Sequence, residues 1–161
     1  MDKPHQRLGS VSNAHVGREF EAVARKVFAS KGISLEKDIK INVGMGENKK
    51  LHSFDLGCIE QKIIVECKSH RWTYPNENVP SAKLTVWNEA MYYFHMAPSG
   101  FRKVLFVLRD LSERRGETLA EYYVRMYRHL IPEDVEIWEY DVKSQEVVQQ
   151  SFNKALHRTS R

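Results

Sequence analysis

Cysteine is scarce in this sequence: only Cys58 and Cys67 occur among its 161 residues. Two cysteines make neither a disulfide framework nor a four-ligand zinc site. Both fall on the apolar side of alternating segments, so we expect them to be small buried hydrophobic residues. Free buried cysteines are typical of reducing compartments, and the sequence therefore predicts a cytoplasmic location.

Long apolar runs are also missing. No stretch of about 18 apolar residues occurs, so the sequence predicts no membrane span, and residues 1–7 lack the apolar core of a secretory signal. The patterns G-x-S-x-G, H-E-x-x-H and G-x-x-x-x-G-K-[ST] are absent, and the seven histidines show no ligand spacing. These absences argue against serine hydrolases, zinc peptidases and P-loop nucleotide-binding proteins.

The charge balance shows no strong excess of either sign. The formal net charge is +4 and the isoelectric point is about 9.0. A mildly basic chain is a weak indication of a polyanionic partner such as nucleic acid. A slightly basic protein without such a partner fits the same numbers equally well.

The most informative stretch runs from His52 to His70. It predicts two strands, 51–60 and 62–69, joined by a tight turn. In the second strand we expect Ile63, Val65 and Cys67 on one, apolar face. The other face is expected to carry the charged residues Glu66 and Lys68, together with Ile64. In the first strand we expect Phe54, Leu56 and Cys58 on one face and Ser53, Asp55 and Gly57 on the other.

Charged residues on such an apolar strand are energetically costly unless they have a partner or a function. Pairing through the turn brings Asp55 near Glu66 and Lys68 on one face. Two carboxylates and an ammonium group suit a hard divalent cation and a nucleophilic water. The alternative is a surface ion pair between Glu66 and Lys68, with Asp55 in a turn.

The remaining chain predicts one domain, residues 1–161, with a core over about 14–142, a polar lead-in over 1–12 and a basic tail over 143–161. Further elements are expected at 14–31 (helix), 37–43 (strand), 81–96 (helix), 103–109 (strand), 117–131 (helix, with an aromatic stripe facing the core) and 135–142 (strand). This order predicts an α/β fold with a mixed β-sheet flanked by helices.

Two segments are candidates for nucleic-acid contacts. A glycine-containing hairpin tip ends in Lys49 and Lys50, which could face a phosphate backbone. The long connection after the second hairpin strand holds His70, Arg71 and Tyr74, which suit phosphate binding and base stacking. Trp72 in the same connection is instead expected to anchor the loop in the core.

The Asp55 carboxylate, a ten-residue gap and Glu66-Cys67-Lys68, preceded by Gly17-Arg-Glu-Phe-Glu21 on the first helix, resemble the PD-(D/E)XK nuclease superfamily. The element order resembles its restriction-endonuclease-like αβββαβ core, here with an appended helix and strand. The resemblance implies that Asp55, Glu66, Glu21 and the carbonyl of Cys67 bind Mg²⁺ or Mn²⁺, and that Lys68 acts on the attacking water. Phe54 stands where many members have proline.

The expected function is therefore a metal-dependent endonuclease acting on DNA. A catalytically silent DNA-binding module, a subunit that needs a partner protein, and an RNA-directed nuclease are alternatives. No helix-turn-helix or zinc-finger reader is evident, so recognition is expected from loops, a homodimer or a partner protein. For Glu21 a solvated position on the helix flank is the competing interpretation.

Overall fold

A computed structural model describes residues 13–152. Within that range the elements are α1 (Asn13–Ser30), β1 (Glu36–Val43), β2 (Lys50–Cys58), β3 (Ile63–Lys68), α2 (Ser81–Met96), β4 (Arg102–Leu108), β5 (Leu111–Ser112), β6 (Glu117–Thr118), α3 (Leu119–Tyr127), the 3-10 helix η1 (Arg128–Leu130), β7 (Val135–Asp141) and β8 (Glu146–Gln149). The predicted α/β class with a mixed sheet and flanking helices is confirmed. No helix in this part of the chain is long and apolar enough to cross a membrane.

Six strands form one sheet in the order β1-β2-β3-β4-β7-β8. The strands β1, β2 and β3 are successive antiparallel neighbours, as the predicted hairpins require. The strands β3, β4 and β7 run parallel, because α2 and then α3 return the chain to the same end of the sheet. The strands β5 and β6 form a separate two-stranded hairpin between β4 and α3.

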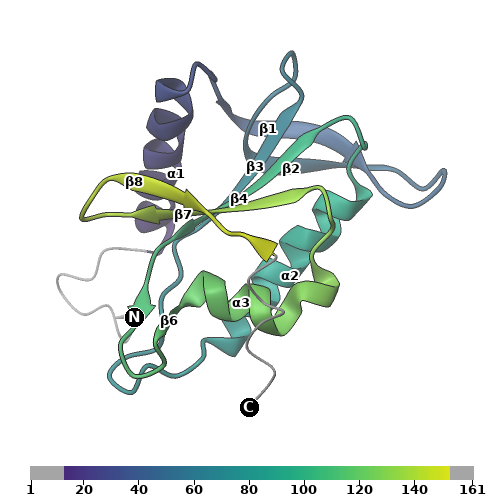
Figure 1. Ribbon diagram of the computed structural model, residues 1–161. Coiled ribbons are helices and arrows are strands. Elements are labelled where there is room, and N and C mark those ends of the chain that lie inside the picture. Colours follow the sequence, from purple (N-terminus) through teal and green to yellow (C-terminus); the bar gives the residue numbers. More distant parts are fainter. Residues whose placement is uncertain (1–12, 153–161) are drawn as a thin grey trace, which may run out of the picture.

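The sheet separates α1 from α2 and α3 (Figure 1), and an apolar cluster lies on each of its faces. On one face α1 contributes Phe20, Ala24 and Phe28. On the other face α2 and α3 contribute the larger cluster, which includes Trp87 and Tyr123. Strand β4 sends residues into both clusters and is buried along almost its whole length, which explains its uninterrupted apolar sequence.

The predicted alternation is confirmed in β3 and wrong in β2. Ile64 belongs to the cluster beneath α2 and α3, while Ile63 and Val65 belong to the cluster beneath α1. In β2, however, Phe54 and Leu56 lie in opposite clusters. The β1–β2 pairing steps from Ile39↔Phe54 to Lys37↔Leu56, and Asp38 between them has φ of 53°. The alternation of side chains along β2 is thus interrupted at Asp55. As a result, Phe54 packs beneath α2 and α3, whereas Leu56 packs beneath α1.

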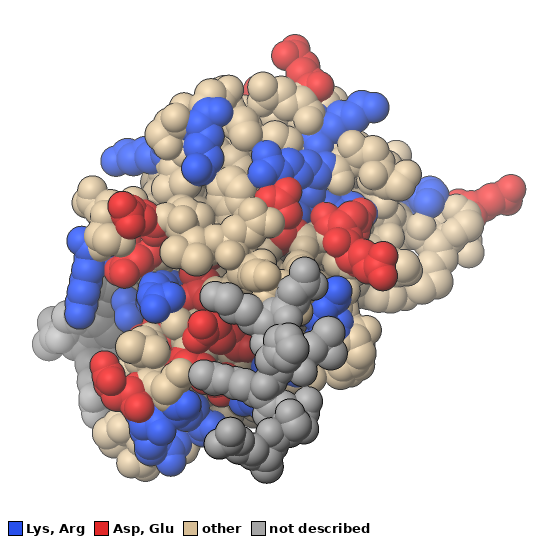
Figure 2. All heavy atoms as spheres, viewed as in Figure 1, with Lys and Arg blue, Asp and Glu red and all other residues tan. Residues whose placement is uncertain are grey.

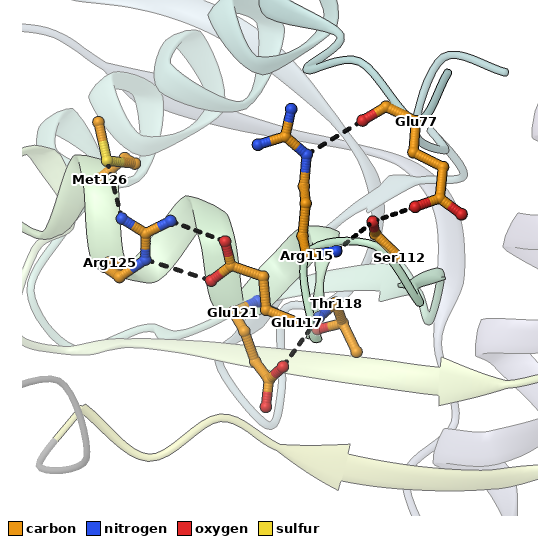
Figure 3. Close-up of polar contacts among 8 residues, drawn as sticks. All are labelled: Glu77, Ser112, Arg115, Glu117, Thr118, Glu121, Arg125 and Met126. Carbon is orange, nitrogen blue, oxygen red and sulfur yellow. Dashed lines mark hydrogen bonds and ion pairs between the residues drawn. The ribbon is translucent and has the colours of Figure 1, made fainter. Parts of the chain in front are cut away.

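The predicted helix 117–131 is shorter than expected. Glu117 and Thr118 form strand β6, and α3 begins at Leu119 because Thr118 caps it. The Thr118 hydroxyl accepts from the Glu121 N–H, and the Glu121 carboxylate accepts from the Thr118 N–H, the latter contact drawn in Figure 3. Of the predicted stripe, Tyr123 is fully buried but Met126 is 46% exposed, so the stripe is only partly a core face.

The predicted tail beyond residue 142 is also partly wrong. Residues 146–149 form β8, which pairs antiparallel with β7 at the edge of the sheet. Its side chains are mostly exposed, and Val147 is the partly buried one that packs against the cluster beneath α1. The remainder of the predicted tail from residue 153, and the predicted lead-in 1–12, lie outside the described residues.

Candidate active site

Three of the predicted site residues meet where β2 and β3 separate. The Lys68 Nζ atom lies 2.9 Å from Oε2 of Glu66 and 4.0 Å from Oδ2 of Asp55. All three side chains are partly or largely buried. Two carboxyl groups therefore share a single ammonium group at the end of β3.

Asp55 is held by the backbone of the neighbouring strand. The Cys67 N–H donates a 2.8 Å hydrogen bond to Oδ2 of Asp55. The backbone pairing between β2 and β3 ends at the pair Leu56↔Val65. The hydrogen bond from Cys67 to Asp55 joins the two strands just beyond that pair. The side chain is thereby placed beside the E-x-K segment and cannot rotate away without leaving a polar N–H unsatisfied.

Glu66 is 6% exposed. Burial, together with the charge of Asp55, raises the pKa of Glu66 to about 7, although Lys68 acts in the opposite direction. Burial alone would lower the pKa of Lys68, but the Glu66 and Asp55 carboxylates outweigh it and raise the pKa. The site thus has an excess of carboxylate over cationic charge.

Glu21 lies half-buried on α1, the helix that covers the neighbouring face of β2 and β3. Burial, then the charge of Asp55, raises the pKa of Glu21, so the two carboxylates are electrostatic neighbours. Within the described residues, no hydrogen bond or ion pair joins Glu21 to Asp55, Glu66 or Lys68. The structure therefore brings Glu21 toward the site without a direct contact.

His52 also borders this site, and sequence reasoning missed it. Its ring stacks on Tyr93 of α2, with centroids 3.6 Å apart and an angle of 11°. Its Nε2 atom is buried without a hydrogen-bond partner among the described residues, and lies 3.7 Å from Oε1 of Glu66. No local pattern signals this contact, because it depends on α2 packing over the end of β2.

Asp110 contacts several residues of the connection that follows β3. Trp72 is 2% exposed, so its predicted role as a core anchor is confirmed. Its backbone N–H donates to Oδ2 of Asp110 at 2.8 Å, and its indole Nε1–H donates to the Asp110 carbonyl at 3.0 Å. Arg71 lies 3.6 Å from Asp110, and the Tyr74 hydroxyl donates to it at 3.4 Å. These two candidate nucleic-acid contacts are therefore partly engaged within the protein.

The far end of this connection is fastened to the β5–β6 hairpin. The Ser112 hydroxyl donates to the Glu77 carboxylate, and Arg115 Nε donates to the Glu77 carbonyl at 3.0 Å (Figure 3). Arg115 also lies over the Trp72 ring, 4.9 Å from its centroid. The loop that follows the candidate site is thus attached at both ends to the segment after β4.

The remaining predicted contacts differ in their surroundings. The Lys49 Nζ atom donates to the Gly44 carbonyl at 2.8 Å and so closes the exposed β1–β2 hairpin tip. Lys50 is exposed at the start of β2. His70 is half-buried and accepts a hydrogen bond from Trp87. On the face drawn in Figure 2, Lys and Arg are interspersed with Asp and Glu, so charge alone indicates no binding surface there.

Carboxylate oxygens are the donor atoms that this site offers to a cation. Among residues 13–152, no group of three or more His, Cys, Asp or Glu side chains could hold a metal ion. The available side-chain donors are the carboxylates of Asp55 and Glu66, which share Lys68. Mg²⁺ prefers oxygen ligands and keeps several waters, so two carboxylates are a suitable donor set.

No protein-family model matches the chain, and searches of curated proteins and of solved structures find no match.

Proposed function

We propose that this protein is a metal-dependent endonuclease that hydrolyses phosphodiester bonds of DNA on a restriction-endonuclease-like fold. One observation carries the proposal: Asp55 and Glu66 share Lys68 at the end of β3. This is the arrangement that the resemblance to PD-(D/E)XK nucleases implies, and it combines residues from two strands. The observed order of a helix, three antiparallel strands, a helix and a parallel strand supports it.

Asp55, Glu66 and the Cys67 carbonyl would hold Mg²⁺ or Mn²⁺, and Glu21, whose pKa is raised by burial and then by the charge of Asp55, would bind a water of the ion. When bound, such a cation lowers the pKa of water and neutralises charge on phosphate oxygens. The protein's contribution is to fix the carboxylates. The hydrogen bond from Cys67 orients Asp55, and Glu66 is buried beside Lys68.

Lys68 is placed to act on the reacting groups. A water oxygen forms a bond to phosphorus, the bond from phosphorus to one sugar oxygen breaks, and the products are a phosphate monoester and a hydroxyl. The water gives up one proton to solvent, and the departing sugar oxygen gains one. The Lys68 ammonium, already within 2.9 Å of Glu66, can orient the water and stabilise the negative charge that develops on the phosphate.

A cleavage panel tests the proposal. Duplex, single-stranded and branched DNA and a matched RNA are incubated with Mg²⁺ or Mn²⁺ and with wild type or Lys68→Met. Lys62→Met is the control, because Lys62 is exposed at the opposite end of β3. We expect metal-dependent cleavage of a DNA substrate by wild type and by the control, and a loss of about 10²–10⁴-fold in Lys68→Met.

The same panel separates the alternatives. Cleavage confined to RNA would replace DNA by RNA as the substrate class. DNA binding without cleavage under any metal would indicate a catalytically silent module or a subunit that needs a partner. Cleavage that is equal in wild type and Lys68→Met would contradict the proposed site.

A further inference from the structure

Trp87 determines the protonation of His70. Trp87 lies on α2 with no exposed surface, and its Nε1–H lies 2.8 Å from Nδ1 of His70. An indole N–H can only donate a hydrogen bond, so Nδ1 of His70 must accept and carries no proton. A neutral imidazole has one N–H, and in His70 it is therefore on Nε2.

The surroundings of His70 oppose a second proton. Burial, then the positive charges of Lys83 on α2 and Lys68 on β3, lower the pKa of His70 to about 4. No carboxylate is among the charges that shift it. His70 is consequently neutral near pH 7 for two reasons: burial, together with the adjacent cations, disfavours its charged form, and the Trp87 N–H requires Nδ1 as an acceptor.

The Nε2–H of His70 is available to a ligand. Within residues 13–152, His70 forms no hydrogen bond or ion pair through Nε2. His70 is half-buried, and its Nε2 is not one of the completely buried unpartnered side-chain atoms of that range, which belong to His52 and Glu139, so Nε2 keeps some exposed surface. A fixed donor thus lies two residues beyond Lys68, with Lys83 as a second cation nearby.

We infer that His70, held by Trp87, is a preset neutral hydrogen-bond donor that binds a phosphate oxygen of the substrate beside Lys68. This inference rests on the proposed function, since it assigns the His70 ligand to the phosphodiester substrate. A neutral donor has a specific advantage here: an imidazolium would repel a divalent cation held by Asp55 and Glu66, whereas a neutral N–H would not. Trp87 is a positioning residue, because it acts only through His70.

Nitrogen-15 NMR of histidine-labelled protein tests the tautomer directly. We expect His70 in the Nε2–H form in wild type, and a mixture of tautomers with a higher pKa in Trp87→Phe, which loses the indole N–H. Trp72→Phe is the matched control, since it removes another buried indole N–H, bonded to Asp110, and should leave His70 unchanged. A wild-type His70 protonated on Nδ1 would overturn the inference.

Ligand binding tests the other part of the inference, that His70 binds a phosphate oxygen, and it uses variants that do not disturb the core. Binding of a duplex oligonucleotide in Ca²⁺, and of inorganic phosphate followed at the His70 nitrogens, is compared in wild type, His70→Gln and His70→Leu. Leucine removes the donor and should weaken duplex binding about ten- to hundredfold. Glutamine keeps an N–H at a similar position and should retain most of the affinity.

The outcomes separate this inference from the proposed function. Phosphate and duplex binding at His70 without any metal-dependent cleavage would support the inference and contradict the nuclease. Metal-dependent cleavage and duplex binding that are unchanged in His70→Leu would overturn the inference and leave the nuclease standing. Absence of phosphate and duplex binding in wild type would overturn the inference.

Discussion

The backbone N–H of Cys67 donates to Oδ2 of Asp55 over 2.8 Å, so Asp55 has a structural partner as well as a proposed metal. This bond lies where the β2–β3 ladder ends at Leu56↔Val65. Removing the charge and removing the hydrogen-bond acceptor should therefore have different effects.

Asp55→Asn keeps a carbonyl oxygen for Cys67 but loses the negative charge. We expect near wild-type stability and a loss of metal-dependent cleavage of at least about hundredfold, because a metal ligand contributes several kcal/mol to the transition state. Asp55→Ala should lose cleavage and also roughly 1–3 kcal/mol of unfolding free energy, because the Cys67 N–H has no acceptor. Cleavage rates and urea unfolding measure the two effects.

Glu133→Gln is the control for these variants, since Glu133 is exposed between η1 and β7. It should change neither cleavage nor stability. An Asp55→Ala variant as stable as Asp55→Asn would show that the Cys67 hydrogen bond contributes nothing to folding.

Mg²⁺ binding should depend on pH through Glu66. Its pKa is raised to about 7 by burial and then by Asp55, and a protonated carboxyl is a poor ligand. The ionised fraction therefore rises between pH 6 and pH 8, and the Mg²⁺ dissociation constant should fall about tenfold over this range. Isothermal titration calorimetry at the two pH values measures this dissociation constant. Affinity that is constant with pH would show that Glu66 does not bind the ion.

The role of Glu21 can be tested against its neighbour Glu19. Glu21 is half-buried on α1 and its pKa is raised by burial and then by Asp55, whereas Glu19 is exposed and lies 3.4 Å from His15. If Glu21 binds a water of the metal, Glu21→Gln should reduce cleavage about tenfold or more, and Glu19→Gln should not. Equal activity in both variants would place Glu21 outside the site.

Glu139 should make stability fall as pH rises. It has no exposed surface, its Oε1 accepts from Thr118 at 2.9 Å, and burial raises its pKa from 4.5 to about 7. A raised carboxyl pKa contributes stability below about pH 4.5, and this contribution is lost as pH rises through about 7.

Glu139→Gln should remove this fall of stability with rising pH. Between pH 5 and pH 8, the unfolding free energy of wild type should fall further than that of the variant, by as much as roughly 3 kcal/mol. Urea titrations at both pH values measure the difference. Glu146→Gln on exposed β8 is the control, and an identical pH dependence in wild type and Glu139→Gln would refute the assignment.

Local patterns predicted much of this fold. Helix α2 has the predicted bounds of 81–96, because its apolar spacing and the following Pro98 and Gly100 are local signals. The turn between β2 and β3 was likewise predictable, and so was the placement of Glu66 opposite Val65 on β3. These features depend on residues near one another in the chain.

Other features depend on segments that are distant in the chain. The alternation along β2 breaks at Asp55 because Phe54 packs against the cluster beneath α2 and α3, whereas Leu56 packs against the cluster beneath α1. Strand β8 exists because β7 offers a free edge, and its own side chains carry little apolar pattern. No local periodicity encodes either requirement.

The sequence by itself determined the order of the three main helices and of strands β1 to β4 and β7, and the E-x-K segment with its candidate carboxylates, because apolar period and turn residues are local properties. Only the tertiary structure decided which groups surround them. His52 meets Glu66 under Tyr93, and Trp87 sets the tautomer of His70. Each of these contacts joins different strands or a strand end to α2, and packing of those elements brings the groups within reach.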